Sequence, residues 1–469
     1  MNRRGFLKLA LLTSGLTVAG YAGYDLLQMT NASVQSIGSQ IQTSSGEQIS
    51  SDWQIPHLLR RAGFGASPSD LDDFRNLGVS GSLDQLINYE NTYDPNLSDT
   101  PDITMTFTLK PARSDMSALI WWWINRMVMT SRPLEEKMTL FWHNHFATAI
   151  YKVRSPFLMF QQNQLLRSRA MGKFEELLMG ITEDPAMLLW LDGATNRKGV
   201  ANENYGREVM EVFTIGRGNY TEDDVKAAAR AFTGYTLNKD GNAVFKPRLH
   251  DDGSKTFLGQ TGNFDPQDIV HILANHPATA RNLSTQLFQF FAFDNPTSDI
   301  IDRLSNIYMG SGGDIKAVVR EILTSPEFMS QQAYLSGVKS PVEYVVSALR
   351  SLDAAVTPNV AIRTLNNMGQ LPFDPPSVFG WPSGIAWINT STMLERYNFP
   401  LYLRNAFGTA LVSQDSGSVD DVGQALFPDG LPEEVVSVIE NANSSLVDSM
   451  DKLRNSVRLT MATPFYNLN

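Results

Sequence analysis

Helix start signals recur along this chain, and they constrain its fold more than any other feature. Ser67, Pro68 and Asp70 supply an N-cap, a proline at the first helical position and an acid in the first turn. Thr221 and Asp224 repeat the combination of cap and acid before a second run. Leucine and methionine recur at helical spacing between such signals. We therefore predict a mainly α fold, built as one large multi-helix domain.

Glycine and proline indicate where several of these helices begin and end. The expected helices run from Pro68 to about Leu77, before Gly78, from Pro133 to about Ala149, and from a cap at Asn202 or Asn204 to Gly216.

Two stretches depart from the helical pattern. Residues alternate around Asn-Lys-Asp-Gly and His-Asp-Asp-Gly turns, which predicts one or two small β-hairpins near 235–260. Residues 373–388 are rich in proline, glycine and tryptophan, and this composition predicts a long ordered loop.

The N-terminus has the pattern of a bacterial twin-arginine export signal. Arg3 and Arg4 precede an apolar stretch of roughly 15 residues, shorter than the roughly 20 needed to span a bilayer. We assign 1–30 to a signal peptide, 31–52 to a flexible Ser/Gln-rich linker and 53–469 to a helical domain. The expected location is the periplasm or the surface of a bacterium, with no stable membrane span after cleavage of the signal.

Charge and cysteine content exclude several classes of function. The 49 acidic residues exceed the 38 basic ones, and no basic run lies outside the signal, so nucleic acid is a poor partner. The chain has no cysteine, which excludes thiolate metal sites, iron–sulfur clusters and a cysteine nucleophile. A protein without disulfides also suits folding in the reducing cytoplasm before export.

His143 and His145 are the first candidates for chemistry. Alternate residues share a face of a strand, where such a pair chelates one metal, but on a helix the two rings point about 200° apart. Either the helix ends at Trp142, or only one ring faces a site. The competing interpretation is a core histidine that donates a hydrogen bond, beside a partly exposed neighbour.

Glu208 and Glu211 are three residues apart, so both carboxylates lie on one helix face. Carboxylates arranged in this way, joined by histidine from another helix, hold iron, manganese or zinc in helical bundles. Arg207 offers a competing interpretation, a surface ion pair with Glu211.

His250 and Asp251 precede a glycine in an expected turn, and Asp192 stands before Gly193 in a similar setting. Aspartate before glycine is common turn chemistry, which is the competing interpretation for both acids. Turn formation does not explain His250.

Six segments stand out together along the chain: HLLRRAGFG at 57–65, LFWHNHFA at 140–147, NENYGREVMEVFTIG at 202–216, YTEDDVKAAARAFTG at 220–234, HDDGSKTFLG at 250–259 and FDPPSVFGWP at 373–382. In this order they resemble the bacterial domain-of-unknown-function family 1800. The resemblance covers the chain from about Trp53 onward, and implies a mainly helical, exported bacterial protein. It also implies a partner, a secreted protein of family 1501 whose gene often accompanies this one, but it supplies no established reaction.

Two functions from different classes follow. The leading hypothesis is a metal-dependent envelope enzyme, hydrolytic or oxidative, that uses a divalent metal such as iron, manganese or zinc. The alternative is a non-catalytic helical scaffold that binds a secreted partner or a surface polymer through 373–388. The enzyme hypothesis takes its metal ligands from His143, His145, Glu208, Glu211 and His250, with Asp251 or Asp192 as the base.

Overall fold

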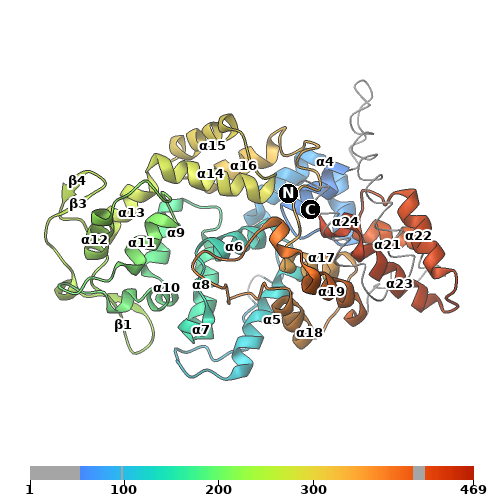
Figure 1. Ribbon diagram of the computed structural model, residues 1–469, viewed down its shortest axis with the longest axis horizontal. Coiled ribbons are helices and arrows are strands. Elements are labelled where there is room, and N and C mark those ends of the chain that lie inside the picture. Colours follow the sequence, from blue (N-terminus) through green and yellow to red (C-terminus); the bar gives the residue numbers. More distant parts are fainter. Residues whose placement is uncertain (1–52, 97–98, 405–417) are drawn as a thin grey trace.

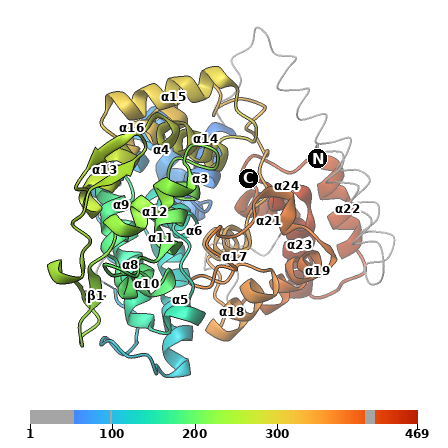
Figure 2. The same ribbon diagram turned by 60° about the vertical axis from the view of Figure 1, so that its left-hand side comes forward.

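The computed structural model describes residues 53–96, 99–404 and 418–469. The predicted signal peptide (1–30) and linker (31–52) lie outside the described residues. Helices dominate the described part, which confirms the predicted mainly α fold (Figure 1). Two small hairpins lie at one end of the molecule and helices α21 to α23 at the other (Figure 2).

The α-helices of the described segments follow one another with mostly short connections. In chain order they are α3 Gln54–Arg61, α4 Pro68–Ile87, α5 Arg113–Met129, α6 Pro133–His145, α7 Ile150–Val153, α8 Pro156–Ser168, α9 Phe174–Glu183, α10 Pro185–Trp190, α11 Glu203–Glu211, α12 Glu222–Ala231, α13 Pro266–Ala274, α14 Pro277–Phe291, α15 Ser298–Gly310, α16 Ile315–Thr324, α17 Pro341–Ser351, α18 Pro358–Asn367, α19 Thr390–Asn398, α21 Val419–Leu426, α22 Glu433–Asn443, α23 Ser449–Ala462 and α24 Pro464–Asn467.

The predicted caps are confirmed, and the predicted helix ends are only partly right. Ser67 and Asp70 form a reciprocal capping box at the start of α4. The helix breaks at Gly78, whose φ is +67°, but a second helical segment follows directly and reaches Ile87. A residue without a side chain adopts this backbone geometry at little cost, so the glycine kinks the element instead of ending it.

Two other helices end earlier than we predicted. Helix α6 ends at His145 instead of near Ala149, because Ala149 is extended and begins the separate helix α7. Helix α11 ends at Glu211 instead of Gly216, because the chain leaves helical geometry before Phe213. A side chain from α6 then binds the free carbonyl of Phe213, and this contact joins the ends of two helices distant in sequence.

The predicted β-hairpins are confirmed as two separate two-stranded antiparallel sheets. Strand β1 (Tyr235–Leu237) pairs with β2 (Ala243–Phe245), with Thr236 opposite Val244. Strand β3 (Lys255–Phe257) pairs with β4 (Gln260–Gly262), with Thr256 opposite Thr261.

Two arginines cap the C-terminal ends of the helices α14 and α5. Arg61 donates to the carbonyls of Phe291 and Ala292, the last turn of α14, at 2.6 and 2.7 Å. Arg350 donates in the same way to the carbonyl of Val128, at the end of α5, at 2.7 Å. Each cation satisfies carbonyls that lack an intrahelical partner and faces the negative end of a helix dipole. Such contacts fix distant parts of the chain relative to one another.

The buried apolar residues form two clusters. The larger one runs through the helices from α3 to α18, extends into α21, α23 and α24, and includes Phe141 and Phe293. The smaller one joins the C-terminal helices to 334–335 and includes Leu335, Phe427 and Leu468. A cavity lies where the two clusters meet. Of the helices in the described segments, none combines the length and apolar character that crossing a membrane requires.

Candidate functional site

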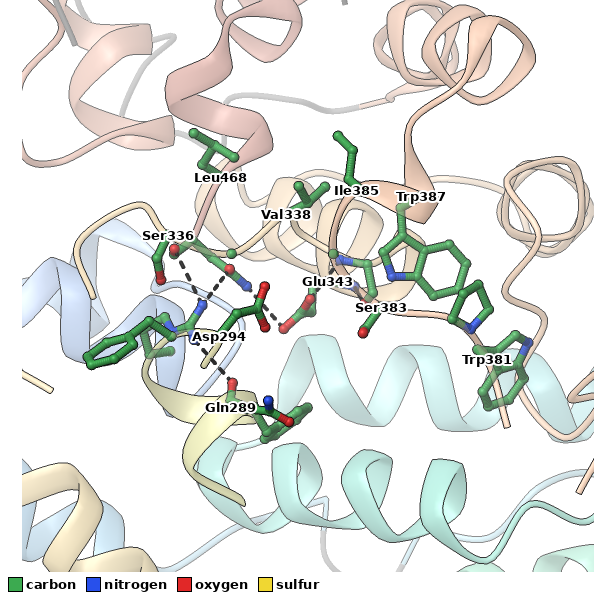
Figure 3. A pocket seen from close by; sticks show the side chains of 18 of the residues that line it. Gln289, Asp294, Ser336, Val338, Glu343, Trp381, Ser383, Ile385, Trp387 and Leu468 are labelled. Atoms are coloured by element: carbon green, nitrogen blue, oxygen red, sulfur yellow. Dashed lines mark hydrogen bonds between the residues drawn. The ribbon is translucent and has the colours of Figure 1, made fainter. Parts of the chain in front are cut away.

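A cavity of about 430 Å³ lies between the two clusters, and we call it the loop cavity (Figure 3). Helices α6 and α14 form one wall, and residues 335–340 with the end of the chain form another. The third wall is the predicted loop at 373–388, which we call the Trp loop, with Trp381 and Trp387 in contact with the cavity. This volume is within the range of small-molecule sites.

Hydrogen bonds fix the Trp loop to the end of α6 and to the start of α7. The backbone N–H of Phe373 donates to Nε2 of His143 at 3.0 Å, and its carbonyl accepts from the N–H of Ile150 at 2.8 Å. Further along, the N–H of Trp381 donates to Oδ1 of Asn144 at 2.7 Å. These contacts confirm that the loop is ordered. Its start and its centre are both held by the last turn of α6 and the turn that follows.

Gly380 is required at the tightest of these contacts. Its φ is +73°, and a Cβ at this position would lie 2.3 Å from Oδ1 of Asn144. An alanine here would be strained and would also collide with α6. The glycine therefore lets the loop press directly against the helix end.

Two of the three charged side chains in the cavity wall are already engaged. Glu343 forms an ion pair with Lys137 and accepts from the N–H of Ser340 and the side chain of Asn469. Burial would raise the pKa of Glu343, but the ammonium of Lys137 more than offsets burial and holds the pKa below its ordinary value. Arg61 caps α14, and burial lowers its pKa to about 10.

Three polar side chains of the wall are open to ligand. Gln289 and Asp294 are exposed at the end of α14, and Ser383 is exposed on the Trp loop. Figure 3 shows Gln289 and Asp294 on the side of the cavity opposite Trp381 and Trp387. The wall therefore offers one free carboxylate, neutral hydrogen-bonding groups and aromatic side chains.

His143 supports the loop from inside the core. Its ring is 1 % exposed and lies 5.1 Å from the ring of Trp123 and 5.5 Å from that of Trp381. Burial lowers its pKa to about 3, so the ring is neutral, and Nε2 accepts the N–H of Phe373. The burial agrees with the competing interpretation of a core histidine, but the ring accepts the hydrogen bond instead of donating it, and the neighbouring His145 is buried instead of partly exposed.

His145 is also on α6, and its surroundings differ from those of His143, as the helical spacing predicts. Both ring nitrogens have partners: Nε2 bonds the carbonyl of Phe213 at 3.0 Å, and Nδ1 bonds the side chain of Gln286 at 3.1 Å. Burial lowers the pKa of His145. The histidine joins the ends of α6 and α11 to α14.

Glu208 and Glu211 lie on one face of α11, as predicted. Arg217 donates to Oε1 of Glu211 at 2.6 Å, and the hydroxyl of Tyr220 donates to Oε2 at 2.8 Å. Arg207 instead pairs with Glu222 and Glu203, so the predicted alternative pair with Glu211 is wrong. Glu208 is half-buried, and burial followed by repulsion from Glu211 raises its pKa.

His250 and Asp251 lie beside the hairpins. Nδ1 of His250 bonds the carbonyl of Thr233 at 2.9 Å, and Asp251 forms a two-pronged ion pair with Arg230. Hydrogen bonding to Arg230 is the main reason the pKa of Asp251 is lowered, to about 2.

Asp192 lies apart from that pair, in a left-handed turn with φ of +60°. It pairs with Lys152 and accepts from Asn204.

The described residues contain no group of three or more His, Asp or Glu side chains placed to hold a metal ion. The predicted ligands His143, His145, Glu211 and His250 instead bond other parts of the protein. The metal site and the base assigned to Asp251 or Asp192 stay predictions, and no step of a mechanism is derived from them.

Sequence reasoning placed the Trp loop correctly but missed the opposite wall. Gln286, Gln289 and Asp294 belong to α14 and its end, and their spacing has no recognisable motif. A run of polar residues on a largely apolar helix was the one signal of this wall, but such residues usually mark a solvated face.

One family model, described as protein of unknown function (DUF1800), matches residues 57–468. The match covers nearly the whole described part, including the helices and the loop that line the cavity. No curated protein and no solved structure matches the chain.

Proposed function

The chain belongs to the DUF1800 family of proteins of unknown function, and for this member we propose binding of a neutral glycan in the loop cavity. The proposal retains the predicted export through residues 1–30, which would place the site in the periplasm or at the cell surface. It takes up the predicted alternative of a non-catalytic protein that binds a surface polymer through 373–388.

One observation carries the proposal: the cavity combines the aromatic side chains of Trp381 and Trp387 with the exposed side chains of Gln289 and Asp294 on the opposite side. A pyranose ring presents C–H groups on its faces and hydroxyl groups at its edges. Aromatic side chains pack against the C–H groups of the faces, and amide and carboxylate groups form hydrogen bonds with the hydroxyl groups of the edges.

The charges of the wall favour a neutral ligand. Arg61 is the one cation among the described residues of the wall, and its N–H groups are directed to carbonyls and to Asn469. An anionic ligand would therefore gain no free positive partner and would face the carboxylate of Asp294. Burying an unpaired charge there would be costly.

Binding is better supported than cleavage. Glycosidases generally use two carboxyl groups, one of which donates a proton. Asp294 and Glu343 are the carboxylates among the described lining residues, and the ion pair with Lys137 keeps Glu343 ionised. Glu343 is therefore not suited to donate the proton, and Asp294 alone does not make up a pair.

A glycan is also favoured over an extended peptide. Peptides often bind by pairing with an open strand edge. The segment beside the cavity is already paired, because the N–H of Lys339 donates to the carbonyl of Asn467 at 2.9 Å and the N–H of Asn469 donates to that of Gly337 at 2.9 Å. Binding of a secreted protein of family 1501 stays a prediction, and the features of the cavity do not bear on it.

Calorimetric titration of the purified chain with chitohexaose and with cellohexaose tests the proposal. Both are neutral, flat β-linked chains. We expect at least one to bind, and Asp294→Ala to weaken that binding about tenfold by removal of a hydrogen-bond acceptor for hydroxyl groups. Asp299→Ala, at an exposed acid five residues away, is the matched control and should leave the affinity unchanged.

Failure of both sugars to bind would contradict the proposal. Binding that is equally strong in Asp294→Ala would place the ligand outside the loop cavity and would also overturn it.

A further inference from the structure

We infer that the glycan site continues beyond the loop cavity onto a second subsite, formed by Phe379, Arg217 and Glu208 on the outer face of the Trp loop. The inference rests on the proposed function, and it specifies the ligand as a chain of several rings rather than one or two. The occupant of the subsite would be the next part of the same neutral glycan.

Phe379 presents a large apolar ring on the surface. It is 57 % exposed, whereas Trp381, two residues further along the loop, is 5 % exposed and lines the cavity. Gly380 between them is pressed against the end of α6. The loop thus presents one aromatic group inward and one outward on either side of a fixed point, and an exposed ring next to a cavity is a feature of binding surfaces.

Arg217 is held over this ring by its neighbours. Its guanidinium carbon lies 5.8 Å from the centroid of Phe379. Glu211 pairs with Arg217, and Tyr220 in turn donates to Glu211. The carboxylate orients the guanidinium beside the ring, and the side chain of Arg217 is itself 75 % exposed. It can therefore donate to a hydroxyl of a sugar that lies on Phe379.

The side chain of Glu208 lacks a hydrogen-bond donor, which is a second and independent observation in favour of a ligand here. Its Oε2 is buried and has no hydrogen-bond partner in the protein. Glu208 lies one turn before Glu211 on the same face of α11, and Glu211 pairs with Arg217, so the three side chains belong to one cluster. A buried carboxylate oxygen without a donor is costly, and a turn of this half-buried side chain toward a bound sugar would give the oxygen a hydroxyl donor.

The cavity and the outer cluster share the same supporting residues. Gln286 lines the cavity and bonds His145, whose other ring nitrogen bonds the carbonyl of Phe213 at the end of α11. Arg217 follows four residues later. Asn144 likewise lines the cavity and contacts Gly380 of the loop. These contacts, through the buried ring of His145 and along the Trp loop, hold the outer cluster next to the cavity wall, so that one long ligand can contact both.

Comparing chitobiose with chitohexaose on the full chain tests the inference. Phe379→Ala should weaken binding of the hexaose about fivefold to tenfold and leave binding of the biose unchanged, because only the longer chain reaches the ring. Glu208→Gln, which keeps one acceptor oxygen and removes the charge, should weaken the hexaose less than Phe379→Ala does. Tyr93→Ala, at a ring that is 82 % exposed elsewhere, is the matched control.

The outcomes separate the two proposals. Equal affinity of the hexaose for wild type and for Phe379→Ala, with Asp294→Ala still impaired, overturns the second subsite and leaves the proposed function standing. Failure of wild type to bind either chain contradicts the proposed function and the extension together. A loss of biose binding in Phe379→Ala would also overturn the inference, because it would place the ring in the first subsite.

Discussion

The side chain of Asn144 binds the backbone of Trp381: Oδ1 accepts the N–H of Trp381 at 2.7 Å. This contact joins the residue between the two histidines of α6 to the tryptophan that lines the cavity. It explains why the end of α6 lies beside the Trp loop. The histidines and the asparagine position the loop.

Removal of that contact should loosen the loop. We expect Asn144→Ala to lower the free energy of unfolding by about 1–3 kcal/mol, because it leaves a largely buried N–H without an acceptor, and to weaken glycan binding as well. Urea denaturation and calorimetric titration check the two effects. Asn367→Ala, whose side chain bonds Glu395 on the surface, is the control and should change stability by less than about 0.5 kcal/mol. Equal stability of the two variants would contradict this role.

Two glycines of the loop allow a matched comparison. Gly380 and Gly384 both have positive φ, of +73° and +60°, but only Gly380 meets backbone and side-chain atoms of Asn144 where a Cβ would lie. Gly384→Ala should therefore cost roughly 1 kcal/mol of backbone strain, whereas Gly380→Ala should cost clearly more and displace the loop. Thermal unfolding and titration measure both. A Gly380→Ala protein as stable as Gly384→Ala would show that the loop does not press on α6.

Acid should destabilise the protein through His143. Its pKa falls from 6.5 to about 3 on folding, so below pH 6.5 the unfolded chain binds a proton that the folded chain excludes. Stability due to this group is therefore complete above pH 6.5 and is lost toward pH 3, by about 1.4 kcal/mol per pH unit over most of that range. His143→Gln, which keeps an acceptor for Phe373, should show a shallower loss.

The His143→Gln variant must be compared with the wild type, because other buried groups raise the stability of the folded state as the pH falls. Burial raises the pKa of Glu135 and of Asp184 to about 7, so these groups favour the folded state as pH falls. Urea titrations at several pH values isolate the His143 contribution as a difference. A difference that does not change between pH 7 and pH 5 would contradict a neutral, buried His143.

The two acids of α11 should respond in opposite ways. Burial and Glu211 raise the pKa of Glu208, so Glu208→Gln, which resembles the protonated form, should leave stability unchanged or raise it at pH 7. Glu211→Gln should lower it, because Arg217 and Tyr220 lose their partner. Melting curves with and without added zinc measure both. If the two acids bound a metal, zinc would raise the melting temperature of the wild type, and neither variant would show that rise.

The ion pair under the cavity should be costly to break. Glu343→Ala leaves Lys137, which is 1 % exposed, without its carboxylate, and we expect a loss of about 3–5 kcal/mol. Glu327→Ala removes one of the two acidic partners of Arg303, a more exposed cation that keeps Glu321, and should cost about 1 kcal/mol or less. Urea denaturation measures both. Similar losses would show that Lys137 finds water or another partner.

The local signals in the sequence predicted much of the fold. The capping boxes at Ser67 and Thr221 and the hairpins near 235–260 depend on residues close together in the chain, and the structure confirms them. Helix ends were less predictable. The early ends of α6 and α11 depend on contacts between distant residues, such as that of His145 with the carbonyl of Phe213. Spacing along one helix carries no information about such a partner.

The site was predictable only on one side. Proline, glycine and tryptophan at 373–388 indicated an ordered loop with a binding role, and the loop forms one wall of the loop cavity. The opposite wall comes from α14, which meets the loop only because Arg61 and Lys137 fix distant segments. Apart from Glu208, the histidines and acids chosen for their chemistry bond the protein itself, a role that residue type alone does not distinguish from metal binding.

A crystal structure of the protein soaked with chitohexaose tests the proposed glycan site most directly. We predict sugar rings in the loop cavity between Trp387 and Asp294, with the chain leaving past Asn144 toward Phe379. Sugar bound on another face of the molecule, with the loop cavity empty of it, would contradict glycan binding at this site.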